Sequence, residues 1–301
     1  MSSSSILFKL KDLKPYFVIL TSFVFFSVYK ECFFKLNYEW LTSNRIVYFL
    51  LTKYTLIYLI LALFGPSYFS SDMYYEANKS IRFSDVGILF VKFAFIYLVL
   101  NKRVTMSITA LLFLTFLVSG NRTSVIAFVS VLSLYYLLFG HVNRKVIYII
   151  SSPVLIFLAY YVVDARGLDF NYEHLREFFI NRFDPFISEF SKFNNSDFVF
   201  GLGVGHPFYI PWFEYRGLNP YNHSIDNLYL TLFVKQGVFS IVTYIFIVYT
   251  CLKITGDRML VFISLLYFAL IGLTSSIIYQ SSFVFLFVFM MLSNNNSRIL
   301  K

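Results

Sequence analysis

Glycines at alternate positions and two histidines gather in the stretch 200–237, which leads into a strongly apolar run. The glycines from Gly201 to Gly205 permit backbone angles that other residues avoid, so the chain can turn sharply there and approach a ligand closely. Their spacing is not a dinucleotide fingerprint, because His206 stands where a third glycine would be required and no βαβ pattern surrounds it. His223 is the better candidate for chemistry, since an imidazole can exchange a proton near neutral pH.

The residues after His223 predict the start of a helix, with Ser224 as its cap and Asp226 in its first turn. The positive end of such a helix disfavours an imidazolium, so His223 would stay neutral and act as a base. The same helix end attracts anions such as phosphate. Asp226 and Asn227 would share a helical face with His223 and could orient it or a sugar. In the alternative interpretation, His223 only hydrogen-bonds the preceding loop at the membrane interface.

Three arginines are candidates for contacts to an anionic ligand. Arg122 lies in the connection 119–123 between two apolar runs, where an arginine either faces a cavity or partner or snorkels to lipid headgroups. Arg182 alone is typical of a solvated surface residue. Together with Arg122 and a helix N-terminus it would form a clamp for a diphosphate, because guanidinium groups bind such oxygens in bidentate fashion. Arg82 is either a third contact of this kind or a headgroup anchor.

Weaker individual signals come from several other polar residues. Lysines interrupt three apolar runs, and snorkelling explains Lys53 and Lys92, whereas Lys235 beside Gln236 lies deeper in its run. We also expect contacts to sugar or phosphate from His206, Glu214 and Arg216.

Other chemistries find little support. No D-x-D or E-x-D pair and no H-E-x-x-H motif occurs in the sequence, so we predict no metal site and no cofactor. A hydrolase triad is disfavoured because the sequence has no G-x-S-x-G elbow. The formal net charge is +9, but the basic residues stand singly between apolar runs rather than on one face, so we expect no nucleic-acid partner.

Membrane helices must hold these residues, because 58% of the chain is hydrophobic and only 14% is charged. We predict an all-α polytopic transmembrane bundle of about nine or ten spans with one large, partly helical loop. The predicted regions are 1–163, N-terminal helices; 164–225, the loop or lid; and 226–301, C-terminal helices. The nine predicted spans are Pro15–Tyr29, Ile46–Phe64, Val86–Leu100, Val104–Val118, Ser124–Phe139, Val146–Val163, Asp226–Cys251, Met259–Ser275 and Ile277–Leu292.

The distribution of lysine and arginine in the short connections predicts the orientation. Placing most of these residues on the cytoplasmic face sends the loop 164–225 to the outer face. With nine crossings, Lys9, Lys11 and Lys14 then also fall on the outer face, against the same rule.

The loop 164–225 is predicted to contain two short helices. Apolar residues at helical spacing in 175–186 indicate a helix that lies on the membrane surface. Asp184 and Pro185 then predict the cap and first position of a second helix, which carries Phe186, Phe190 and Phe193.

The order of these features resembles the superfamily of O-antigen polymerases (Wzy) and O-antigen ligases of the bacterial envelope, and it is more similar to the polymerases. The residues that carry the resemblance are Ser119-Gly120-Asn121-Arg122-Thr123, Asn181-Arg182-Phe183, Gly201-Leu202-Gly203-Val204-Gly205, and His223-Ser224-Ile225-Asp226-Asn227 followed by Leu230 and Gly237. One departure is that the family usually has more helices before the Arg82 region.

The resemblance implies a metal-independent glycosyltransferase of the GT-C type at the periplasmic face of the inner membrane. Its donor would be an undecaprenyl-diphosphate-linked oligosaccharide, and a chain-length regulator protein is an implied partner. Arg122 and Arg182 would hold the diphosphate, and His223 would orient or deprotonate the acceptor hydroxyl. Two alternatives stay open: an O-antigen ligase that transfers glycan to the lipid A core, and a flippase for the same lipid-linked glycan.

Overall fold

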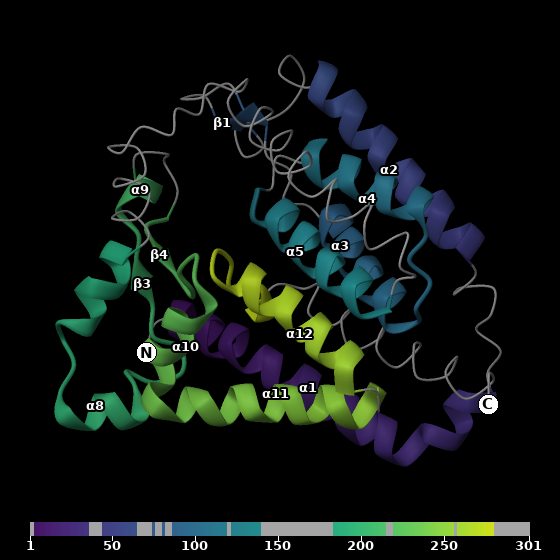
Figure 1. Cartoon of the computed structure of the whole chain (residues 1–301). Coiled ribbons are helices and arrows are strands. Elements are labelled where there is room, and N and C mark those ends of the chain that lie inside the picture. Colours follow the sequence, from purple (N-terminus) through teal and green to yellow (C-terminus); the bar gives the residue numbers. More distant parts are fainter. Residues whose placement is uncertain are drawn as a thin grey trace. The chain divides into compact units, whose positions relative to one another are not determined.

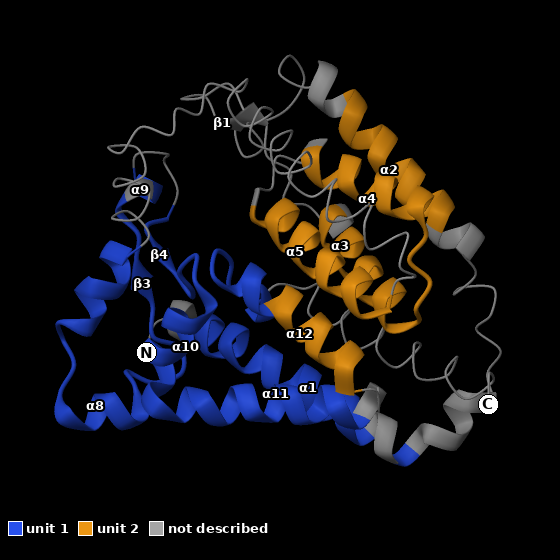
Figure 2. Ribbon diagram, viewed as in Figure 1, with its two compact units in different colours: residues 1–28, 170–254, 269–287 blue, residues 29–169, 255–268, 288–301 orange. Residues whose placement is uncertain are grey.

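The structure is a computed structural model in which the chain is mostly helical, as expected for the all-α class (Figure 1). It divides into two compact units, coloured separately in Figure 2. Unit 1 comprises 1–28, 170–254 and 269–287, and unit 2 comprises 29–169, 255–268 and 288–301. Each unit therefore combines segments from more than one of the three regions predicted along the sequence. The described residues are 3–35, 44–64, 74–75, 80–81, 86–118, 122–139, 183–214, 219–255 and 258–279.

Unit 2 is built around helix α3, whose residues 91–100 are all buried. Apart from Lys92, which is also buried, α3 is apolar on all sides and therefore needs neighbours on all sides, and this explains its central place. Phe95 of α3 packs edge-on against Phe128 and Tyr267, at ring-centroid distances of 4.8 and 5.1 Å. The labelled elements of unit 2 are α2 (Asn44–Phe64), β1 (Tyr74–Tyr75), β2 (Ser80–Ile81), α3 (Val86–Leu100), α4 (Met106–Val118), α5 (Arg122–Phe139) and the first part of α12 (Arg258–Gly272).

Unit 1 combines the N-terminal part of α1 (Ser3–Lys35) with segments from much later in the chain. Helix α1 runs beside α11, because Tyr16 reaches Thr243 and the ring of Phe23 lies 6.2 Å from that of Tyr249. The other elements of unit 1 are the helical residues 183–190, α8 (Asn195–Phe200), β3 (Phe208–Tyr209), α9 (Pro211–Glu214), β4 (Tyr221–Asn222), α10 (Leu228–Gln236), the 3-10 turn η3 (Gly237–Phe239), α11 (Ser240–Thr255) and η4 (Ile277–Tyr279).

A small apolar core lies beneath the loops of unit 1. Its buried residues come from β3 and the residue after it, from the segment before α10, and from α10 itself: Phe208, Ile210, Ile225 and Val234. Phe186 and Phe193 pack against this core, and Phe190 stacks on Phe186 with ring centroids 5.4 Å apart. The predicted second helix of the loop is present and carries Phe186 and Phe190, but Asp184 lies inside the helical residues 183–190 and is not their cap, and Phe193 follows the helix. The predicted surface helix lies mostly outside the described residues.

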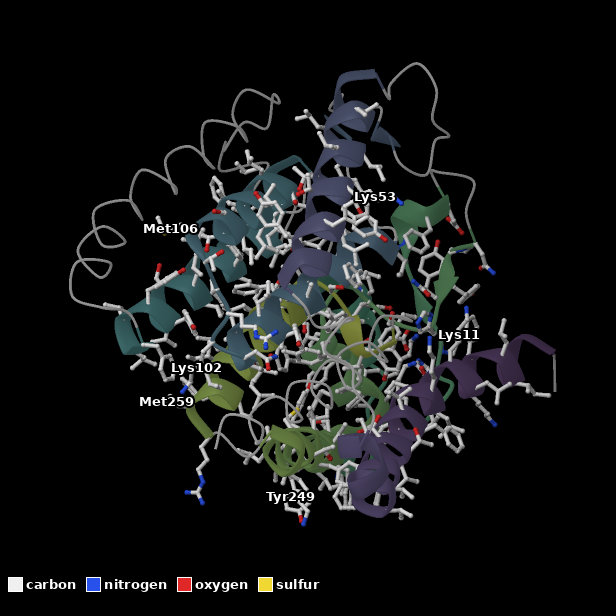
Figure 3. All side chains as sticks on the ribbon, turned by 90° about the vertical axis from the view of Figure 1, so that its right-hand side faces the viewer. Lys11, Lys53, Lys102, Met106, Tyr249 and Met259 are labelled. Carbon is white, nitrogen blue, oxygen red and sulfur yellow. The ribbon has the colours of Figure 1, made fainter. Side chains whose placement is uncertain are left out.

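One helix among the described residues, Leu228–Lys253, is long and apolar enough by length and composition to cross a membrane. It joins α10, η3 and α11, and the predicted span Asp226–Cys251 coincides with it except that the structure breaks the helix at Gly237, which has a φ of 55°. Tyr249 is half exposed and points away from α11, as expected for a side chain that contacts lipid (Figure 3).

The predicted spans that correspond to α1, α2, α3, α4, α5 and α12 are helical, but their crossing of a membrane stays a prediction. The predicted span Val146–Val163 lies outside the described residues, as does most of Ile277–Leu292.

Candidate functional site

A buried ion pair between α1 and α10 stands at the centre of the candidate site. The Nζ atom of Lys235 lies 2.5 Å from both carboxylate oxygens of Asp12, and both residues are only 1% exposed. The residues are 223 positions apart in the sequence, so the pair ties the N-terminal helix to the loop region. An isolated charge at such a position would be strongly disfavoured, and each residue therefore depends on the other.

Lys235 also binds the backbone at His223. Its ammonium donates to the carbonyl oxygen of His223, in addition to its two contacts with Asp12. The same Nζ atom lies over the rings of Phe208 and Tyr279, 5.6 and 5.3 Å from their centroids, where aromatic faces attract a cation. The three donors of the ammonium are thus occupied, and its surroundings are set by four different elements.

The glycine loop, defined as residues 201–205, closes the C-terminal end of α10. Leu202 N donates to Val234 O at 2.7 Å, and Gly203 N donates to Lys235 O at 3.1 Å. These carbonyls have no partner within their own helix, so the loop satisfies acceptors that would otherwise be orphaned. At the other end of the loop, Gly205 N donates to a carboxylate oxygen of Asp12 at 2.7 Å.

Gly201 and Gly203 need to be glycine for different reasons. Gly201 has φ 68° and ψ −177°, and a Cβ there would collide with the backbone of Lys235 and Gln236. Gly203 has φ 93°, but a Cβ there would meet nothing within 4 Å. Gly201 therefore serves the close approach of the loop to α10, whereas Gly203 serves only the backbone conformation.

We expect Gly201→Ala to destabilise the protein much more than Gly203→Ala. The first substitution combines a backbone collision with an unfavourable conformation, whereas the second carries only a conformational cost of about 1–3 kcal/mol. Thermal unfolding of the two variants in the same detergent measures the difference. Equal melting temperatures for the two variants would contradict the close approach of the glycine loop to α10.

The helix after His223 begins later than the sequence predicts. Asn227 is its cap, with a side-chain oxygen that accepts a hydrogen bond from Leu230 N at 3.0 Å, and α10 begins at Leu228. The prediction of Ser224 as cap and Asp226 in the first turn is therefore wrong. Sequence reasoning took the first suitable polar residue, although Asn is as good a cap as Ser.

The segment 223–227 is held by side chains instead of by helical bonds. Thr231 Oγ1 accepts from Ile225 N at 3.2 Å, and Ser276 donates to Ile225 O. Asn227 also donates to Leu273 O at 3.1 Å, and Asp226 is exposed. The described contacts of Asn227 are structural, and the predicted substrate contacts of Asp226 and Asn227 stay predictions. Because the segment is not helical, the expected helical face shared by His223, Asp226 and Asn227 does not exist.

The imidazole of His223 lies against Tyr279, with ring centroids 5.6 Å apart and planes at 83°. Its Nδ1 atom is buried and has no hydrogen-bond partner among the residues that the structure describes. Desolvation, with the nearby ammonium groups of Lys235, Lys11 and Lys14, lowers the pKa of His223 to about 4. The imidazole is therefore neutral at physiological pH, as the sequence predicts, but the causes are burial and lysines and not a helix end.

His206 belongs to a second polar cluster. Its Nε2 atom lies 2.7 Å from Glu189 Oε2, and Lys192 Nζ lies 2.8 Å from Glu189 Oε1. Burial alone would raise the pKa of the Glu189 carboxyl, but the hydrogen bonds from His206 and Lys192 bring that pKa below its usual value. The described contacts of His206 thus anchor the glycine loop to the helix 183–190, and its predicted contact with substrate stays a prediction.

The other predicted site residues receive less information from the structure. Arg122 begins α5 in unit 2, and Glu214 is exposed at the end of α9. Arg82, Arg182 and Arg216 lie outside the described residues.

Sequence reasoning singled out Lys235 but missed Asp12. Asp12 stands among the lysines of the N-terminal segment Lys9-Leu10-Lys11-Asp12-Leu13-Lys14, which looks like a solvated flank of a membrane helix. The available signal was that this is the only acidic residue before Glu31, in a segment whose lysines conflicted with the predicted orientation.

The contact of Asp12 with Lys235 predicts the membrane face of the N-terminus. Lys235 binds both Asp12 and the backbone of His223, so Lys11, next to Asp12, should lie on the same side of the membrane as His223. Figure 3 labels Lys11 on α1.

We expect cysteines at Lys11 and at Asp226, both exposed in the structure, to react alike with a membrane-impermeant maleimide in intact cells. A cysteine at Lys253 should react only after permeabilisation, and unsubstituted protein gives the background of Cys32 and Cys251. If the cysteine at Lys11 instead reacts under the same conditions as the cysteine at Lys253, and not as the cysteine at Asp226, this arrangement is wrong.

Comparison with known proteins identifies the family of the chain but no relative of known function. No curated protein and no solved structure matches the chain. A protein family described as "Family of unknown function (DUF6369)" matches residues 13–301. The match includes α1 from just after Asp12, the glycine loop, His223 and Lys235. Because it covers almost the whole sequence, the chain belongs to this family.

Proposed function

We propose that this protein is a metal-independent glycosyltransferase that joins oligosaccharide repeat units carried on a polyprenyl diphosphate, as a Wzy-type O-antigen polymerase does. The reaction would take place at the outer, periplasmic face of a bacterial inner membrane, in a multi-pass protein. The observation that supports the proposal is the neutral, partly buried imidazole of His223 beside the lysines of α1. A neutral base next to cationic groups suits a reaction that removes a proton from a hydroxyl and releases an anion.

The proposed reaction transfers one proton to the protein and releases one leaving group. The acceptor hydroxyl oxygen forms a bond to the anomeric carbon of the donor, and the bond from that carbon to the diphosphate oxygen breaks. The electron pair of the broken bond leaves with the lipid diphosphate, and the hydroxyl proton passes to the His223 imidazole. Each atom and charge is accounted for without a metal ion or cofactor.

The lysines of α1 make the base dependent on the donor. Lys11 is exposed and Lys14 is partly buried, and both lower the pKa of His223. A diphosphate bound near these ammonium groups would offset their field and raise the pKa of the imidazole. His223 would then become a stronger base only when donor is present, which would limit side reactions with water.

Arg122 and Arg182 keep the role that the resemblance implies. Guanidinium groups would hold the diphosphate oxygens, whereas Lys11 and Lys14 would contribute point charges. A chain-length regulator protein is the expected partner.

The decisive experiment is elongation of a synthetic polyprenyl-diphosphate oligosaccharide by the purified protein, with and without a metal chelator. A ladder of products in both conditions supports the proposal. Failure to elongate repeat units of the native structure overturns it.

Deletion of the gene separates the alternatives. Lipopolysaccharide with single repeats indicates a polymerase, and complete loss of repeats from the core indicates a ligase. Accumulation of lipid-linked units on the cytoplasmic side indicates a flippase.

A further inference from the structure

The Asp12–Lys235 pair connects three parts of unit 1 to the residue proposed as base. Asp12 accepts from Gly205 N in the glycine loop and from Lys235 in α10, and Lys235 donates to the carbonyl of His223. The backbone at His223 is thus one hydrogen bond away from a fully buried charge pair. Tyr279 covers both the ammonium and the imidazole.

We propose that Asp12 and Lys235 are positioning residues for His223: together they fix the backbone of the segment 223–227 and place a cationic charge beside the imidazole. This inference rests on the proposed function for its catalytic consequence, but not for its physical content. Neither residue touches the expected substrate, since both are buried.

Stability alone does not account for a pair of this kind. A buried ion pair costs desolvation of both partners, and a matched pair of apolar side chains is often equally stable or more stable. The position of Lys235 inside the apolar helix Leu228–Lys253 makes the cost larger. Contact of its third donor with the His223 carbonyl gives the charge a use that an apolar residue could not supply.

The electrostatic part of the inference depends on every charge that acts on His223. Lys235 acts from α10, and Lys11 and Lys14 act from α1. Asp12 offsets part of the Lys235 field, and Tyr279 from η4 contributes an aromatic wall that excludes water. Among these groups, Lys235 is the charge that is fixed in place by three contacts.

Two variants distinguish the effect of the Lys235 charge from the effect of its hydrogen bond to the His223 carbonyl. Asp12→Leu with Lys235→Met removes both charges and the bond to the His223 carbonyl, and it leaves no unpaired ion. Lys235→Gln removes the cation but keeps the Asp12 carboxylate and an amide whose two N–H groups can still donate to Asp12 and to the carbonyl. Lys53→Gln, an exposed lysine of α2 in unit 2, is the matched control.

Nuclear magnetic resonance of histidine-labelled protein in detergent measures the titration of His223 directly, with His223→Gln to assign its signal. We expect the pKa of His223 to rise from about 4 in both variants, because each loses the Lys235 charge, and the rise should be larger, about one unit or more, in Lys235→Gln, which keeps the opposing charge of Asp12. The pKa of His223 in the Lys53→Gln control should equal that in wild-type protein. An unchanged titration in the two variants overturns the electrostatic role.

Elongation kinetics measure the effect of losing the hydrogen bond to the His223 carbonyl. We expect the double variant to lose kcat by about 10- to 100-fold through misplacement of the base, and Lys235→Gln to lose less. The acid limb of kcat/KM against pH should move upward in both, because the base must be unprotonated and its pKa has risen. Full activity in the double variant overturns the positioning role. If wild-type protein does not elongate glycan while the titration shift occurs, the proposed function fails and the role of the pair stands.

Discussion

Replacement of His223 by glutamine should lower the elongation rate of the purified protein by about 10²- to 10⁴-fold, the range that general-base catalysis contributes. Glutamine keeps a polar side chain of similar length but cannot accept a proton from a hydroxyl. The loss should appear in kcat more than in the apparent affinity for the donor. In cells, lipopolysaccharide should then carry single repeats instead of long chains.

The matched control is Tyr221→Phe in β4, two residues before His223. Tyr221 is 53% exposed, so the change removes one hydroxyl from the surface near the site. We expect this variant to elongate normally. If His223→Gln elongates as fast as Tyr221→Phe, the imidazole is not the base.

Replacement of Lys235 alone by methionine should destabilise the protein by about 3–5 kcal/mol, because Asp12 would remain as a buried charge without its cation. For a chain of this size, that loss corresponds to a decrease in melting temperature on the order of 10 °C. Thermal unfolding in detergent, at a pH near 7, measures it.

Lys53→Met controls for the loss of a lysine from an apolar helix. Lys53 is exposed on α2, so we expect a change of no more than about 0.5 kcal/mol. Addition of Asp12→Leu to Lys235→Met should recover a large part of the lost stability, because the unpaired carboxylate is removed. If the single variant melts like wild-type protein, Lys235 and Asp12 do not form the pair.

The lengths of the apolar runs were sufficient to locate most of the long helices of the described chain. The span Val86–Leu100 coincides with α3, because that run is interrupted only by Lys92 and is bounded by polar residues. The break at Gly237 was harder to predict, since a single glycine inside an apolar run is compatible with a continuous helix. It depends on the contact of that glycine with the backbone of Phe198 and Val199, which no local pattern reveals.

At the candidate site, too, local sequence predicted some properties, whereas contacts between distant residues could not be predicted. The helix start predicted after His223 indicated that its imidazole would be neutral, and the depth of Lys235 in its apolar run suggested a special role. The partner of Lys235 could not be predicted, because Asp12 is 223 residues away and its neighbours resemble a helix flank. The cause of the neutral imidazole therefore came from tertiary contacts, and the predicted helix cap was wrong for lack of them.

The sequence distance between Asp12 and Lys235 also sets the order of events at the ribosome. Synthesis at the usual 5–20 residues per second separates the two residues by roughly ten to forty seconds. During that interval the carboxylate of Asp12 cannot pair with Lys235, so α1 must keep its acidic residue in water or at the headgroups. Unit 1 can therefore close only after α10 has emerged, so α1 reaches its final contacts long after its own synthesis.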